Sequence, residues 1–300
     1  MNVQMFRLGW VALTAAAIPA FAVAPAHPGT LNFIEGKVLV DGRDVTSKSI
    51  GGADVPAGSV LTTGSGKAEV LLTPGVFLRL GSHSEIRMVS SGLMDTRIAV
   101  NRGVAMLDAT DVRKENKIQI ANSGLNSAIK DEGLYRFDSG RGSVSVFKGK
   151  AEVRQADAVE EVNKGKEVVA SDDSVLKVEK FDTKEAKADE LYRWSDLRSK
   201  YLADASAVTA QRVMLQPGLW SGSGWYWNPW WGTYSWLPAG SAMFSPFGYG
   251  FYSPFRYYSR PMYVGPRYRA YPPRMSAPGM RAPGMRGPAM MGPRSGRVRR

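Results

Sequence analysis

Between residues 31 and 180 the chain is divided into apolar runs that are too short to form helices. The runs are about 4 to 6 residues long, and turns rich in Gly, Pro, Asn and Asp separate them at intervals of about 8 to 12 residues. Apolar and polar side chains alternate regularly at Ile118 and Ile120 and at Tyr135 and Phe137. Such alternation places one face of a strand on a core and the other face in water. The pattern predicts a mainly β fold of many short strands, either a sandwich or roll or a short β-solenoid.

A short segment occurs twice within this region. Ile34–Val40 and Phe147–Val153 each place a Gly-Lys pair shortly before a strand valine. The two copies predict equivalent positions in a repeating scaffold. Two copies are too few to separate a solenoid from a sandwich, so both topologies stay open.

The order of motifs from residue 57 to residue 88 resembles that of the FecR domain. The pieces are a glycine turn ending in Thr-Thr-Gly, a strand, a Pro-Gly turn, an LRLG strand and a Ser-Glu-x-Arg segment, at Ala57–Gly64, Lys67–Leu72, Pro74–Gly75, Phe77–Gly81 and Ser84–Met88. Asn101–Met106 and Lys148–Val153 also fit, so the resemblance covers about residues 33–170. It implies a β-rich extracytoplasmic interaction domain. The best-known members of that family couple an outer-membrane transporter to a sigma factor.

A single amphipathic helix is predicted after the β region, over about residues 183–213. The segment Asp182–Glu185 has the spacing of a capping box, and Gly and Pro are absent from there to Pro217. Apolar side chains then recur every three or four residues, at Leu191, Trp194, Leu197, Tyr201, Ala205 and Val208. This stripe predicts that Leu191 and Trp194 either dock on the β domain or face a separate partner.

Charge is distributed unevenly along the chain, whose net charge is +12. All 27 acidic residues lie at or before Asp204, where an equal number of basic residues balances them. The whole excess therefore belongs to the chain after Asp204, which contains arginine and no acid. This distribution excludes a uniformly basic globular domain and predicts a basic C-terminal tail.

Residues 216–260 form a segment rich in Trp, Tyr, Gly and Pro. It contains six of the eight tryptophans, and no charged residue occurs between Arg212 and Arg256. Three interpretations are open: the rings stack on envelope sugars, they enter a membrane interface, or they pack on the β domain as an irregular wrap. The first two make five side chains candidate envelope contacts, namely Trp225, Trp227, Trp230, Trp231 and Trp236.

Residues 261–300 are of low complexity, and the sequence predicts a disordered basic tail. Ala277–Arg281 is repeated at Ala282–Arg286, and frequent Pro and Gly leave little material for a core. Anionic lipid or acidic glycan is the expected partner of such a tail, and nucleic acid is not expected in vivo for an exported protein. The tail adds four candidate envelope contacts, Arg281, Arg286, Arg294 and Arg297.

Residues 1–26 have the pattern of a cleavable signal peptide. Arg7 is followed by an apolar run from Leu8 to Ile18, and small residues lead to Ala24-Pro-Ala26. An Ala-x-Ala pattern is typical of a signal peptidase site, and the apolar run is short for a membrane span. The sequence therefore predicts a mature protein that begins at His27 and lies in the periplasm or at the cell envelope.

Residues with catalytic or ligand-binding chemistry are scarce. The absence of cysteine excludes disulfides, thiolate metal sites and cysteine nucleophiles. The two histidines are His27, beside the predicted cleavage site, and His83, in a predicted turn. The segment Gly64–Lys67 lacks the spacing of a phosphate-binding loop, and the sequence has no nucleophile elbow and no calcium loop. We expect no catalytic residue, no metal site and no cofactor, and hence no enzyme.

Together these features predict a non-catalytic interaction module of the cell envelope. Its partner is expected to be a protein, including one of the outer membrane, or an envelope glycan or lipid. The alternative is a FecR-type regulatory sensor in transmembrane signalling. The predicted organisation is a signal peptide (1–26), a FecR-like β domain (27–180), an amphipathic helix (181–215), an aromatic segment (216–260) and a basic tail (261–300).

Overall fold

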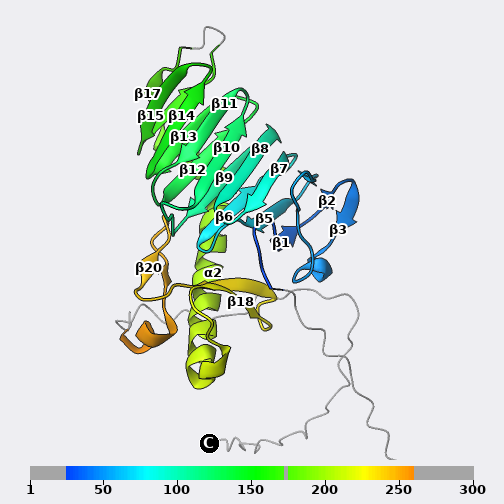
Figure 1. Ribbon diagram of the computed structural model, residues 1–300. Coiled ribbons are helices and arrows are strands. Elements are labelled where there is room, and N and C mark those ends of the chain that lie inside the picture. The colour runs from blue at the N-terminus through cyan, green and yellow to red at the C-terminus, as the bar shows by residue number, and fades with distance from the viewer. Residues whose placement is uncertain (1–24, 172–174, 260–300) are drawn as a thin grey trace, which may run out of the picture. The chain divides into compact units, whose positions relative to one another are not determined.

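Two large β-sheets dominate the computed structural model, which describes residues 25–171 and 175–259 (Figure 1). The first sheet has eight strands, in the order β1 (Leu31–Glu35), β5 (Lys67–Leu71), β6 (Val76–Leu80), β9 (Val104–Ala109), β12 (Gly133–Asp138), β13 (Ser143–Lys148), β16 (Lys166–Val169) and β17 (Val178–Lys180). The second has nine, in the order β15 (Ala158–Asn163), β14 (Lys150–Gln155), β11 (Leu125–Ile129), β10 (Lys117–Asn122), β8 (Asp95–Arg102), β7 (Glu85–Gly92), β4 (Val60–Thr63), β2 (Val38–Val40) and β3 (Arg43–Val45). The mainly β prediction is confirmed.

The chain advances along both sheets in one direction. Within each sheet the strand order follows the order in the chain, apart from the exchange of β2 and β3 at one edge. The chain crosses to the opposite sheet after every one to three strands, and neighbours are antiparallel except for the parallel pair β8 and β10. The topology that the sequence left open therefore has the two sheets of a sandwich and the stepwise advance of a solenoid.

The main core lies between the two sheets. Buried side chains from both sheets form one cluster, with Leu78 and Tyr135 on the first sheet and Ile98 on the second. Strand β10 shows the predicted alternation, because Ile118 and Ile120 are buried while its intervening polar side chains are exposed. This period of two gives the second sheet one apolar face and one solvated face.

Strands β5, β6, β9, β12 and β13 of the first sheet are covered on both faces. Every residue of β5 and β6 is buried, because the chain after residue 181 packs on the outer face. Leu71 and Phe77 contact Leu202 there, and Leu134 contacts Leu191. This second layer has its own apolar clusters, separate from the core between the sheets.

Residues 183–215 form two helices, α1 (Thr183–Ala188) and α2 (Glu190–Leu215), where the sequence predicted one. Asp182 begins α1 by accepting hydrogen bonds from the backbone N–H groups of Lys184 and Glu185. Asp189 interrupts the helix with a ψ of 143° and its side chain caps α2 in the same way. A second N-cap residue inside the predicted helix therefore divides it.

The predicted apolar stripe of α2 is only partly the buried face. Leu191 is buried as expected and Trp194 packs on the ring of Phe33, but Leu197 and Val208 are exposed. The buried residues of α2 are largely small or polar, at Leu191, Ser195, Arg198, Ser199, Leu202, Ala203, Ala205, Ser206, Ala207, Thr209, Ala210 and Val213. Ser206, Thr209 and Val213 pack on residues 228–237, whereas Ser195, Arg198 and Ser199 face the sheet. The sheet presents buried charges at this position, so polar side chains fit better than a leucine stripe.

The aromatic segment contains regular structure, a point that the sequence left undecided. Its elements are η2 (Pro217–Leu219), β18 (Gly224–Asn228), β19 (Thr233–Leu237), β20 (Met243–Phe244), β21 (Gly250–Phe251) and η3 (Pro254–Ser259), whereas η1 (Ser47–Ser49) belongs to the β region. The β18–β19 hairpin and η3 pack along the C-terminal half of α2, which extends past the two sheets (Figure 1). No helix among residues 25–171 and 175–259 is long and apolar enough to cross a membrane. Most of the predicted signal peptide and the whole predicted tail lie outside these ranges.

The two copies of the repeated segment occupy equivalent corners. Each carries the chain from the first sheet to the second, with β1 and β2 joined at Gly36 and β13 and β14 joined at Gly149. Both glycines have positive φ, at 68° and 91°. A Cβ atom at Gly149 would collide with the Tyr135 hydroxyl, so the corner requires glycine for space as well as for conformation.

Candidate functional site

The five tryptophans suggested as envelope contacts divide into a packed group and an exposed group. Trp236 is completely buried, so in this fold it cannot reach an envelope polymer. Trp225 and Trp227 are half-buried and meet the rings of Phe77 and Tyr234 edge-on, with centroids 5.2 and 5.1 Å apart. For these three side chains, packing on the protein itself is the interpretation that the structure supports.

Trp230 and Trp231 form the exposed group, at the turn between β18 and β19. Trp230 is 70% exposed and Trp231 is 40% exposed. The guanidinium of Arg212 lies 5.6 Å from the centroid of the Trp230 ring, and Trp231 lies against Tyr201 of α2 with centroids 6.0 Å apart. The remaining candidates, Arg281, Arg286, Arg294 and Arg297, lie outside the described residues.

A buried asparagine holds this turn on α2. The side-chain amide of Asn228 donates to the Ala205 carbonyl at 3.2 Å and to the Thr209 hydroxyl at 3.0 Å. Its Oδ1 accepts from the backbone N–H groups of Trp230 and Trp231, at 3.1 and 3.2 Å. Asn228 thus joins the turn to the helix and sets the direction in which the two indoles leave it.

Exposed apolar side chains gather around the last two turns of α2. Leu215 is 73% exposed and Phe255 is 69% exposed. Trp220 stacks on Tyr226 of β18 and meets Phe255 edge-on with centroids 5.6 Å apart. We call this surface the distal aromatic end and define it by Arg212, Leu215, Leu219, Trp220, Trp230 and Phe255. Large exposed apolar groups in one place are typical of an interaction surface.

The distal aromatic end carries positive charge, and the part of the sequence that forms it contains no acidic residue. Arg212 belongs to this surface, Arg256 directly follows Phe255, and no acid follows Asp204. Asp204 and Leu215 are separated by about 16 Å along the helix at 1.5 Å per residue. A partner of this surface is therefore expected to be apolar or negatively charged.

A buried charge network holds α2 on the first sheet. Arg79 donates from Nε to Glu69 at 2.8 Å and from Nη1 to Asp108 at 3.0 Å. From α2, Arg198 donates to Glu69 at 2.7 Å and Ser199 donates to Asp108. All five side chains are buried, so two carboxylates of the sheet are balanced by one arginine of the sheet and one of the helix.

The two arginines keep Glu69 ionised. Burial by itself would raise the pKa of Glu69, but the guanidinium groups of Arg198 and Arg79 outweigh burial and lower the pKa to about 2. The carboxylate is therefore charged at neutral pH and depends on α2 for part of its compensation. The network thus fixes the helix that carries the distal aromatic end to the first sheet.

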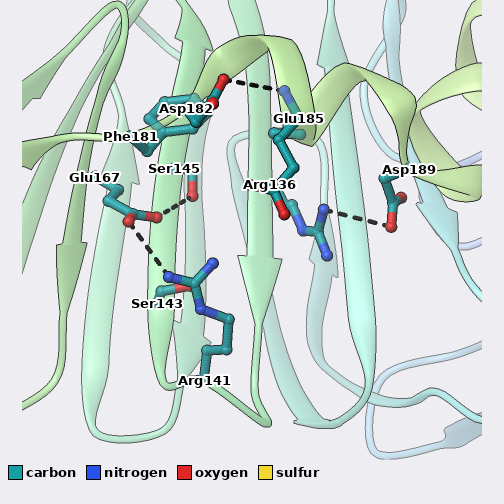
Figure 2. A pocket seen from close by; sticks show the side chains of 10 residues that line it. Arg136, Arg141, Ser143, Ser145, Glu167, Phe181, Asp182, Glu185 and Asp189 are labelled. Carbon is teal, nitrogen blue, oxygen red and sulfur yellow. Dashed lines mark hydrogen bonds and ion pairs between the residues drawn. The ribbon is translucent and has the colours of Figure 1, made fainter.

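A polar cavity of about 320 Å³ lies on the outer face of the first sheet beside α1 (Figure 2). Both arginines of the cavity are paired within its wall, since Arg136 lies 3.6 Å from Asp189 and Arg141 lies 3.4 Å from Glu167. Glu167 also accepts a 3.0 Å hydrogen bond from Ser145. No histidine lines the cavity, whose residues are Arg136, Arg141, Ser143, Ser145, Glu167, Phe181, Asp182, Glu185, Ala186 and Asp189.

Most charged side chains of the cavity are engaged by neighbouring groups. Both oxygens of Glu167 are engaged, one by Arg141 and the other by Ser145. Asp182 and Asp189 are occupied as helix caps. Within residues 25–171 and 175–259, no group of three or more His, Asp or Glu side chains is placed to hold a metal ion. Sequence reasoning did not find this cavity, because only the folded chain brings its residues together from three strands and a helix.

Comparison with known proteins finds distant similarity only. No family model matches the chain, and no curated protein matches it. Two crystal structures of a proposed anti-sigma factor from Parabacteroides distasonis, at 2.50 and 1.65 Å resolution, are similar with 15% and 14% identity and a TM-score of 0.36 for each. Each similarity covers 43% of this chain, and the chain spans only 62% and 63% of the length of those structures.

Proposed function

We propose that this protein is a non-catalytic interaction module of the cell envelope. In this proposal the two-sheet body is a scaffold that carries α2, and the distal aromatic end is the contact surface for an envelope partner. The observation that carries the proposal is the exposure of Leu215, Trp230 and Phe255, together with the buried hydrogen bonds that hold α2 on the sheet and the Trp230 turn on α2. The export signal expected in residues 1–26 supports a location outside the cytoplasm.

The motifs that resemble the FecR domain support the scaffold part of this proposal. Two of their residues, Glu69 and Arg79, belong to the buried network beneath α2. In this chain those motif residues are structural, since they hold the sheet and the helix together. Regulatory signalling of the FecR type remains the alternative, and it requires a transporter or a regulator as the partner.

Site-specific photo-crosslinking in native cells tests the proposal. A photoreactive phenylalanine analogue at Phe255 should form crosslinks in envelope fractions. The same analogue at Met94, which is 66% exposed on the β7–β8 hairpin, is the matched control and should form few. Crosslinks of equal yield from both positions, or recovery of the protein in the cytosol with Met1 retained, would refute the proposal. A transporter or regulator in the Phe255 crosslinks would favour the FecR-type alternative.

A further inference from the structure

We infer that the distal aromatic end binds the surface of a bilayer that contains anionic lipid. This inference rests on the proposed function, because it takes the distal aromatic end to be the contact surface. It adds the chemical class of the partner. Three observations carry it: the kinds of side chain that are exposed, the sign of the charge beside them, and their arrangement around the end of α2.

The exposed side chains are both aliphatic and aromatic. The aliphatic residues are Leu215 and Leu219, and the aromatic ones are Trp230 and Phe255. Sugars are bound through the flat faces of rings, and a leucine offers no such face. A bilayer interface accepts both kinds, since the indole lies at the headgroup level and leucine and phenylalanine enter the acyl boundary.

The arrangement also disfavours a glycan platform. The rings that would make a continuous stacking surface are turned against the protein, as Trp225 is against Phe77 and Trp227 is against Tyr234. The exposed rings of Trp230 and Phe255 stand on separate elements. The C-terminal end of α2 extends past the two sheets (Figure 1), so a flat surface can approach it without meeting the β body.

Charge selects the kind of lipid. Arg212 lies over the Trp230 ring and Arg256 follows Phe255, so each exposed aromatic has an arginine next to it. Basic side chains beside an inserted apolar group attract anionic headgroups. No acid follows Asp204 in the sequence to oppose this attraction.

Vesicle flotation with the full chain tests the inference. The protein should float with vesicles of phosphatidylglycerol and phosphatidylcholine in equal parts, and poorly with phosphatidylcholine alone. Part of the binding should persist at about 1 M salt, where screening within about 3 Å removes the contribution of the tail arginines. The double variant Leu215→Ser/Phe255→Ser should lower this salt-resistant binding by about tenfold or more, because two large apolar groups are lost.

The matched control is Leu93→Ser/Met94→Ser, on the exposed tip of the β7–β8 hairpin. It removes similar apolar groups and should leave flotation unchanged. Equal binding by both double variants, or no salt-resistant binding at all, would overturn the inference. A dimer in analytical ultracentrifugation that Leu215→Ser/Phe255→Ser dissociates would also overturn it, since a second copy would then cover the surface.

The proposed function can survive failure of this inference. Crosslinks from Phe255 to an envelope protein, together with absence of vesicle binding, would leave the interaction module standing and exclude lipid. Absence of both would refute the two proposals together. Circular dichroism of the double variants shows whether any loss of binding reflects unfolding.

Discussion

Arg198 of α2 donates a 2.7 Å hydrogen bond from its Nη2 to Oε1 of Glu69 in β5, and both side chains are buried. The contact joins parts of the chain that lie 129 residues apart. It is an ionic contact between the β body and the helix that carries the distal aromatic end. Because a buried charge tolerates the loss of its partner poorly, this contact makes the stability of the sheet depend on the position of the helix.

Arg198→Met should lower the free energy of unfolding by about 3 kcal/mol in urea denaturation. The variant keeps an apolar stem but removes one of the two guanidinium groups that compensate Glu69. Lys200→Met is the control on the same helix, because its pair with Asp204 is exposed and contributes less than about 1 kcal/mol. Similar losses of unfolding free energy in the two variants would show that the buried contact stabilises the protein no more than the exposed pair does.

Acidic pH should destabilise the folded protein over a pH range that is set by the pKa of Glu69. Its pKa is about 2 in the folded chain and 4.5 ordinarily, so the folded state binds fewer protons between these values. The stabilisation is therefore complete above about pH 4.5 and is lost as pH falls towards about 2, with a magnitude of about 3 kcal/mol.

Unfolding free energies from about pH 6 to about pH 2 check this dependence. Glu69→Gln should be less stable than the native protein at the upper end of this pH range. The difference in unfolding free energy between the two proteins should become smaller as the pH falls, because the variant has no carboxylate to protonate at this position. A difference in unfolding free energy that stays constant across this pH range would show that Glu69 is not the source of the pH dependence.

Asn228→Ala should destabilise the β18–β19 turn by about 1–3 kcal/mol, because it leaves buried partners on α2 and in the turn without hydrogen bonds. The variant should also become sensitive to proteolysis around Trp230 and Trp231. Asn126→Ala is the control, since Asn126 is exposed in β11. A variant at Asn228 as stable and as protease-resistant as the control would show that the turn is held by other contacts.

Gly149→Ala should lower the melting temperature more than Gly165→Ala. Both glycines have positive φ, at 91° and 78°, so each alanine costs about 1 kcal/mol of backbone strain. Only at Gly149 would the new Cβ also collide with the Tyr135 hydroxyl, while nothing lies within 4 Å of it at Gly165. The additional loss should be about 1–3 kcal/mol. Equal melting temperatures would show that the corner adjusts.

The local features of the fold were predictable from the sequence. The alternation at Ile118 and Ile120 and the Pro74-Gly75 turn correspond to a strand and a tight turn in the structure. The cap at Asp182 also lies where the spacing placed it. These features depend on preferences within a few neighbouring residues, so a single sequence contains them.

The candidate surface was predictable only in part. Composition pointed to the tryptophans of residues 216–260, but Trp236 is buried and Trp230 is exposed. Both have the same local composition around them. What separates them is packing against Phe251, Phe77 and α2, which are distant in the chain or in a different element.

The sequence by itself determined the β class, the turns, the beginning of the helical region and the separation of basic from acidic segments. Only the tertiary structure decided how the two sheets share the strands, which tryptophans remain exposed, and why α2 turns serines and Arg198 towards the sheet. That helix face follows from Glu69, Arg79 and Asp108 on the strands beneath it. The periodicity of a sequence indicates which apolar side chains are buried. It does not indicate which charged side chains are buried, because their burial depends on partners from distant segments.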